Sequence, residues 1–227
     1  PKSELPEESG GWCDYMVELE FFKSMPEGIR KDAWFLTKVT MTGQERNPET
    51  GRYPLLNWDD PATNQKHPYW KKNIESSDWV FNYDDGYYET KGISSASGKT
   101  RMIFRYADIL LLYAEAVAYG TKSIDDLAFD CMWRVQERAG VPLISKDVTK
   151  EYFQKAVLDE RRWETAGMEH SCMGRFFTMQ RHEILHLQKN YRDAAELSLN
   201  PNLTLSEEFY YFPIPDNELL IVPGLKD

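Results

Sequence analysis

The feature of this sequence that most constrains its fold is a change near residue 100 from interrupted sequence to helical periodicity. Residues 1–100 are interrupted by proline, glycine and asparagine, which predicts a loop-rich segment with one short helix at 14–23 and one short strand at 34–41. From Phe104 onward, apolar residues recur at helical spacing. We therefore expect a mainly α fold with few short strands, in which residues 101–227 form a helical domain.

Helix start and stop signals divide the second part of the chain into four expected helices. Gly120 and Gly140 are helix stops, and Thr149 is a residue type that caps helix N-termini. Ser123, three residues before Asp126, resembles a capping box at the start of the second helix. The short connection before it predicts an antiparallel helix pair. The expected helices span residues 105–119, 124–139, 150–166 and 175–191.

The charge and the cysteines exclude several classes of protein. The chain carries 37 acidic and 27 basic residues, a net charge of −10, so it is not expected to bind nucleic-acid phosphates or an anionic membrane surface. No apolar run approaches the roughly 20 residues of a membrane-spanning helix. Cys13, Cys131 and Cys172 are too few for a disulfide scaffold and lack paired metal-site spacing, so we expect buried thiols.

Four sequence blocks follow one another in the helical part. They read RYADILLLYAEA at 105–116, VQERAGVP at 135–142, VLDERRWE at 157–164 and PIPDNEL at 213–219. Together they resemble the SusD/RagB family, whose blocks read R-Y-A-E-x-L-L-x-Y-A-E-A, V-x-x-R-A-G-L-P, I-x-x-E-R-R-x-E and P-I-P-x-x-E-I. The chain departs from this pattern at Asp108, where the family usually has Glu, and at Thr178, where the family has an acid.

The resemblance implies a SusD-like helical fold and a binding function without catalysis and without a cofactor. It implies a protein on the cell surface, held at the outer membrane by a lipid on an N-terminal cysteine that this chain does not contain. The partner would be a SusC-like TonB-dependent transporter, and the cargo an oligosaccharide or polysaccharide, or a peptide as in the RagB branch. The polar first residues suggest a longer parent protein, whose N-terminal helical-repeat half is expected to be absent here.

Several charged residues lie on the otherwise apolar helices. An acid–base catalytic set is one interpretation, but partly buried charges must be paired to offset their desolvation, so we expect a structural ion network. Arg105 and Asp108 lie one helical turn apart and can pair locally. The residues concerned are Arg105, Asp108, Glu115, Arg138, Glu160 and Arg161.

A rival function rests on the string His182-Glu183-Ile184-Leu185-His186, which fits the H-E-x-x-H pattern of zinc peptidases. On a helix the two imidazoles would share one face and could hold zinc, with Glu183 as general base. Glu207 or Glu208 would be the third protein ligand. The helix is polar and crowded with charges, so we favour the binding protein over this metallopeptidase alternative.

Residues 53–88 carry nine aromatic side chains interleaved with carboxylates and amides, a mixture that suits a carbohydrate platform because sugar C–H groups stack on aromatic faces. We expect at least half of these rings to pin loops to the core instead. Trp58 is the favoured ligand contact because it lies at an expected exposed turn, with Tyr53, Trp70 and Asp59 as helpers. Alternatively, the ligand site lies wholly in the absent half and this segment only docks. The aromatic residues are Tyr53, Trp58, Tyr69, Trp70, Trp79, Phe81, Tyr83, Tyr87 and Tyr88.

Overall fold

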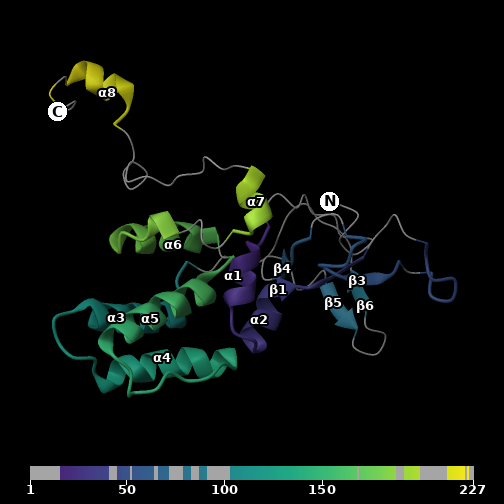
Figure 1. The fold of residues 1–227 in the computed structure, drawn as a ribbon, viewed down its shortest axis with the longest axis horizontal. Coiled ribbons are helices and arrows are strands. Elements are labelled where there is room, and N and C mark those ends of the chain that lie inside the picture. The colour runs from purple at the N-terminus through teal and green to yellow at the C-terminus, as the bar shows by residue number, and fades with distance from the viewer. Residues whose placement is uncertain are drawn as a thin grey trace.

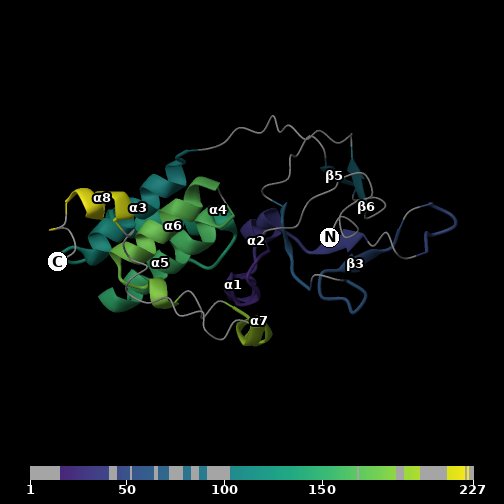
Figure 2. The same cartoon turned by 90° about the horizontal axis from the view of Figure 1, so that it is seen from above.

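The computed structural model describes residues 16–40, 45–51, 53–63, 66–71, 79–82, 87–90, 103–167, 169–187, 192–199, 214–222 and 224. Its helices are α1 (Leu19–Ser24), α2 (Ile29–Trp34), α3 (Tyr106–Tyr119), α4 (Asp126–Ala139), α5 (Lys150–Thr165), α6 (Glu169–Arg181), α7 (Ala194–Leu199) and α8 (Asp216–Ile221). Helices α3 to α6 gather at one end of the molecule and the strands at the other, with α1 and α2 between them (Figures 1 and 2). The expected mainly α fold is confirmed.

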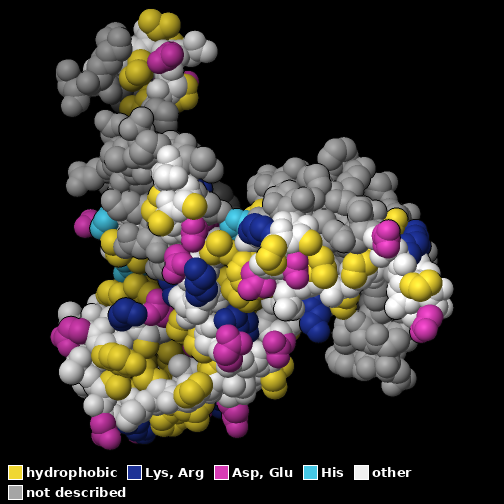
Figure 3. Space-filling model, turned by 45° about the vertical axis from the view of Figure 1, so that its right-hand side comes forward, with side chains coloured by type: hydrophobic (Ala, Val, Ile, Leu, Met, Phe, Trp, Pro, Cys, Tyr) yellow, Lys and Arg dark blue, Asp and Glu magenta, His cyan; other side chains and the backbone are white. Residues whose placement is uncertain are grey.

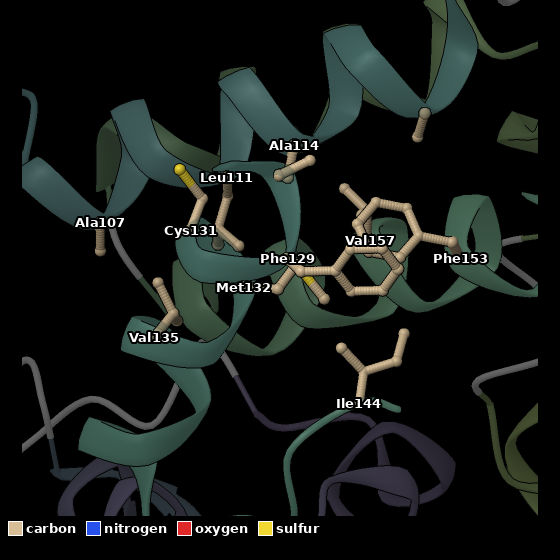
Figure 4. Close-up of a cluster of buried hydrophobic side chains, with 12 residues drawn as sticks. Ala107, Leu111, Ala114, Phe129, Cys131, Met132, Val135, Ile144, Phe153 and Val157 are labelled. Atoms are coloured by element: carbon tan, nitrogen blue, oxygen red, sulfur yellow. The ribbon is translucent and has the colours of Figure 1, made fainter. Parts of the chain in front are cut away.

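Helix α3 is the centre of the helical end, because it packs against both α4 and α5. The side chains of Leu111, Met132, Phe153 and Val157 are fully buried between these helices (Figure 4). Alanines of α3, such as Ala114, allow close approach of the neighbouring helices. Burial of a large apolar side chain stabilises a fold by roughly 1.5–3 kcal/mol, so this cluster is the main hydrophobic core.

The bulky apolar residues that give α3 its helical period are not the ones that it buries. Ile109 is 53% exposed and Tyr113 is 36% exposed, whereas Leu111 is fully buried. On α4, Leu127 is likewise exposed while Val135 is buried. Because α3 is apolar on more than one side, its period identifies a helix without indicating which face meets the core. Hydrophobic side chains are visible at the surface of this end in Figure 3.

Most of the expected helix signals are confirmed by local hydrogen bonds. The Thr149 hydroxyl accepts from the Tyr152 N–H at 3.2 Å, and Gly140 ends α4 in the left-handed conformation. The prediction of a capping box at Ser123 is wrong, because Asp125 caps α4 by accepting from the Ala128 N–H at 2.8 Å. A carboxylate nearer the first turn takes the place of the serine hydroxyl.

The fourth expected helix, at 175–191, is wrong at both ends, because α6 spans Glu169–Arg181. Glu183 adopts a left-handed backbone conformation with φ of 55°. The Glu183 N–H donates to the Gln180 carbonyl at 3.0 Å and the Ile184 N–H to the Met179 carbonyl at 2.8 Å. These two bonds form a Schellman motif, which ends a helix and is usually built on glycine. A glutamate in that position gave no stop signal in the sequence.

Three antiparallel strand pairs make up the β-structure of the described residues. The expected strand at 34–41 is split in two: β1 (Phe35–Leu36) pairs with β4 (Tyr69–Trp70), and β2 (Lys38–Thr40) pairs with β3 (Leu55–Asn57). The third pair joins β5 (Trp79–Asn82) to β6 (Tyr87–Thr90). The expected short helix at 14–23 is present as α1, but it begins only at Leu19, because residues 16–18 are not helical. None of the described helices is both long and apolar enough to span a membrane.

A second hydrophobic cluster joins the loop-rich part to the helical end. Val17, Met25 and Phe35 are buried in it, and Trp70 and Trp163 pack against them. Gly167, just after α5, has a left-handed φ of 67°, and a Cβ atom there would lie 2.5 Å from the Trp70 ring. The Trp70 ring therefore covers a position that only glycine can occupy without a shift.

We predict that Gly167→Ala destabilises the protein by roughly 2–4 kcal/mol, the sum of a left-handed backbone penalty and an overpacked contact with Trp70. Gly51→Ala is the matched control, because Gly51 has a φ of 68° and nothing within 4 Å of an added Cβ. The control should lose only about 1–2 kcal/mol. Urea unfolding of both variants measures the difference, and equal losses would contradict the proposed contact.

Candidate functional site

The expected turn around Trp58 is present and is held by its own hydrogen bonds. Strand β3 ends at Asn57, and the Trp58 N–H donates to the Thr37 carbonyl at 2.9 Å. The Asp60 carboxylate accepts from the Ala62 N–H at 2.8 Å, which closes the turn. The Thr63 hydroxyl donates to the Trp58 carbonyl at 2.8 Å from inside the turn. These bonds fix the backbone on both sides of Trp58 without using its indole.

The Trp58 ring is less exposed than the sequence predicted. It is half-buried and meets the Phe22 ring of α1 edge to face, with 5.7 Å between ring centroids. Phe22 in turn contacts the buried Phe35 ring at 5.1 Å. Trp58 is therefore anchored on the second hydrophobic cluster and only part of its indole remains accessible. Its role as a ligand contact stays a prediction.

The three expected helpers lie in different surroundings. Asp59 is exposed, and its carboxylate makes no hydrogen bond to the described residues. The guanidinium of Arg46 lies 4.3 Å from the centroid of the half-buried Tyr53 ring. Trp70 packs on Phe35 at 5.1 Å between centroids and covers Gly167. Trp70 is thus placed as a packing residue, and its contact with a ligand stays a prediction.

The structure brings Trp58 and Asp59 together as neighbours in one turn, and a chain of ring contacts through Phe22 and Phe35 links Trp58 to Trp70. Among the aromatic residues that the sequence singled out, Tyr69 is buried, as expected for a ring that pins a loop. Tyr83 and the side chains of Trp79, Phe81, Tyr87 and Tyr88 lie outside the described part of the chain, and so do the side chains of Cys13 and Cys172. Cys131 is a free, buried thiol whose pKa is raised by burial, as expected.

Two carboxylates of α5 form the centre of the ion network. Glu164 is fully buried and accepts from Arg105 at 2.7 Å, from Arg138 at 2.6 Å and from Arg30 at 3.3 Å. Arg105 also pairs with Asp108 at 2.8 Å, as the sequence predicted. These arginines come from α2, from the N-terminus of α3 and from α4. The structural interpretation of the helical charges is confirmed, because each of these carboxylates is paired with a cation.

Glu160 lies one turn before Glu164 and shares Arg30 with it. The Arg30 guanidinium donates to the Glu160 carboxylate, which also faces the Gln136 amide at 3.5 Å. Burial raises the pKa of Glu160, and the attraction of Arg30 opposes that shift without cancelling it. Arg30 is therefore the counter-charge that allows this carboxylate to ionise inside the fold.

A separate hub forms around Glu115 of α3. Its carboxylate accepts from Arg161 of α5, from Arg181 of α6 at 2.7 Å and from the Nε2 atom of His182 at 2.8 Å. Burial disfavours the charged form of Glu115, but these partners outweigh it and lower its pKa. Glu115 thus links the C-terminal end of α6 to α3 and α5.

This hub explains His182 without zinc. Its imidazole is hydrogen-bonded to Glu115 and packs against the tilted Tyr119 ring, with 4.1 Å between ring centroids, whereas His186 is exposed. The helix that would align the two imidazoles ends at Arg181, and Glu183 is left-handed. Within the described residues no group of three metal-ligating side chains is found. Glu207 and Glu208, the third ligands of that hypothesis, lie outside them.

Sequence reasoning missed Arg30 and Glu164. Glu164 had a signal, since it follows Glu160 by four residues and so shares its helix face. Arg30 had no signal of this kind, because its partner on α5 lies more than a hundred residues away in the sequence.

Comparison with known proteins agrees with this mainly helical architecture. The model of the SusD family matches residues 1–227, and the chain therefore belongs to the SusD/RagB family. The chain is similar to a solved SusD superfamily protein from Parabacteroides distasonis, with a TM-score of 0.63 and 17% identity over 98% of this chain and 43% of that one.

Two further solved structures share the fold. A SusD superfamily protein from Bacteroides vulgatus gives a TM-score of 0.56 and 20% identity over 98% of this chain and 46% of that one. A SusD homolog from Bacteroides thetaiotaomicron gives a TM-score of 0.51 and 19% identity over 86% of this chain and 39% of that one. The chain thus spans less than half the length of these relatives. A search of curated proteins gave no match.

We predict that Glu164→Gln destabilises the protein by about 3–5 kcal/mol, because it leaves three arginines beside a buried group without charge. Asp130→Asn is the control, since it breaks the exposed pair with Arg134 and should cost less than about 1 kcal/mol. Guanidinium unfolding of the two variants tests this prediction. A Glu164→Gln variant as stable as the wild type would show that the network contributes no net stability.

The lowered pKa of Glu115 predicts an acid-sensitive fold. Its contribution to stability is present above the ordinary glutamate pKa and is lost as the pH falls through the lower folded-state value. The melting temperature of the wild type should therefore drop more steeply than that of Glu115→Gln between about pH 5 and pH 3. Parallel melting curves over that range would contradict it.

Proposed function

We propose that this chain is part of a non-catalytic cell-surface protein that binds glycans and hands them to a SusC-like TonB-dependent transporter in the outer membrane. Membership of the SusD family supports this proposal. The protein would be held at the membrane by a lipid-bearing N-terminal cysteine. Residues 101–227 would be the helical SusD-type C-terminal domain, and residues 1–100 would contribute to the ligand face.

The observation that carries the ligand site is the pairing of Trp58 with Asp59 in a turn that needs neither side chain for its own closure. The turn is closed by Asp60 and Thr63, while the Asp59 carboxylate is exposed and makes no hydrogen bond within the described structure. A partly open indole beside an unused carboxylate offers a stacking surface and an acceptor for a sugar hydroxyl. Tyr53 and Trp70 would be further aromatic contacts for the ligand.

A peptide cargo is the second candidate, because an aromatic ring beside a carboxylate also suits peptide side chains and basic groups. A glycan array and a peptide pool, both applied to the full-length parent protein, distinguish the two. The proposal expects retention on glycans, and selective retention of peptides would replace it with the RagB-like alternative.

We predict that Trp58→Ala weakens glycan binding by roughly five- to thirty-fold, the loss of one stacked ring at about 1–2 kcal/mol. Affinity electrophoresis with polysaccharide on the full-length parent protein measures it. The control is Tyr106→Ala, which removes an aromatic ring that is 67% exposed on α3.

Because Trp58 also contacts Phe22, the melting temperature of each variant must be measured as well. A Trp58→Ala protein that unfolds readily, while its folded fraction binds normally, would show that Trp58 only anchors the loop. Binding that survives substitution of Trp58, Tyr53 and Asp59 together would place the site in the part of the parent protein outside this chain.

A further inference from the structure

The side of α3 that faces away from the core is apolar. Every exposed residue of α3 between Ile109 and Tyr119 is aliphatic or aromatic, whereas Glu115, the charged residue in this stretch, is buried. Successive residues of an α-helix turn by about 100°, so the exposed positions share one stripe roughly 120° wide. We call this stripe the outer face of α3. It consists of Ile109, Leu112, Tyr113, Ala116 and Tyr119.

The neighbouring helices do not share this pattern. The exposed positions of α4 and α5 are mostly charged, as with Arg134 and Glu137 on α4 and Glu151 and Lys155 on α5. A helix at a protein surface normally carries polar residues on its outer side, and a helix that is hydrophobic all round is normally buried. Helix α3 therefore has the sequence of an enclosed helix, although α4 and α5 pack only on its inner side.

The outer face can be covered without leaving the Tyr113 hydroxyl unpaired. That hydroxyl donates to the Asp125 carboxylate, just before α4, at 2.9 Å, so its ring presents only carbon atoms to a partner. At the other end of the face, the Tyr119 ring packs against His182. Burial of this face would therefore remove apolar surface from water at little cost in lost hydrogen bonds.

The residue types on the outer face favour another helix as its partner. Leu112, Ala116 and Tyr119 follow one another at intervals of four and three residues, which forms a ridge that fits the groove of a second helix. A glycan is disfavoured, because the face offers no carboxylate or amide to its hydroxyl groups. A membrane surface is disfavoured as well, because interfacial helices carry lysine and arginine, and α3 has neither between Tyr106 and Tyr119.

The length of the solved relatives indicates where such a helix comes from. More than half of each of the two relatives from Parabacteroides distasonis and Bacteroides vulgatus lies outside the part that this chain matches. A segment of the same polypeptide is held close to α3 by its covalent connection, which gives it a high effective concentration. A second copy of the chain would have to offset the loss of its translational and rotational freedom. The same polypeptide is therefore the favoured source.

We propose that the outer face of α3 is a docking surface, covered in the parent protein by the apolar side of a helix from the sequence outside residues 1–227. The helical domain is thus completed by a segment that this chain does not contain. The proposal does not depend on the cargo or on the site proposed at Trp58.

The reactivity of an introduced cysteine in the native full-length parent protein tests whether the face is covered. Ile109→Cys is compared with Lys155→Cys, whose native side chain is 78% exposed on α5. Each rate of reaction with a maleimide is divided by the rate of the same variant in urea, after subtraction of the reaction of the wild-type thiols. We expect Ile109→Cys to react about tenfold or more slowly than Lys155→Cys, because local opening must precede its reaction. Equal rates would overturn the proposal. If Ile109→Cys fails to fold, Ala116→Cys gives the same readout with a smaller change of volume.

A photo-cross-link then identifies what covers the face. Tyr113→p-azidophenylalanine is introduced into the parent protein, and an equal mixture of ¹⁵N-labelled and unlabelled molecules is irradiated and mapped by mass spectrometry. We expect a cross-link to a peptide from outside residues 1–227 of the same molecule. A cross-link to a peptide within residues 1–227, a cross-link between labelled and unlabelled molecules, or no cross-link would each contradict the proposed occupant.

Discussion

The fold depends on two buried carboxylates of α5, Glu160 and Glu164, and on the arginines that neutralise them. An unpaired carboxylate in such a position would be too costly to keep ionised. Arg30, Arg105 and Arg138 reach them from α2, from the start of α3 and from α4. The network therefore fixes how three segments meet α5, and the hydrophobic cluster around Leu111 and Phe153 fills the space that this arrangement leaves.

The sequence predicted the helices whose limits are set by local chemistry. Gly140 and Thr149 are standard stop and start residues, and they act where expected. The end of α6 could not be predicted, because a glutamate takes the left-handed position that glycine usually holds. The structural role of the helical charges followed from desolvation alone, but the partner Arg30 could not be found, since no local pattern links α2 to α5.

The candidate site was predicted in part. The turn at Trp58 followed from its residues, and the exposed Asp59 agrees with it. The burial of half the Trp58 indole against Phe22 did not follow, because a contact between α1 and a distant turn leaves no local mark in sequence.

Arg30 has a further consequence for how such proteins diverge. It lies in the loop-rich segment, yet it completes the electrostatics of the helical domain. The change of sequence pattern near residue 100 is therefore not a boundary between two parts that can be exchanged freely. A loop-rich segment grafted here from a relative would have to bring a cation to the place of Arg30. The turns of that segment could then vary in sequence, while the short helix that carries this arginine stays fixed.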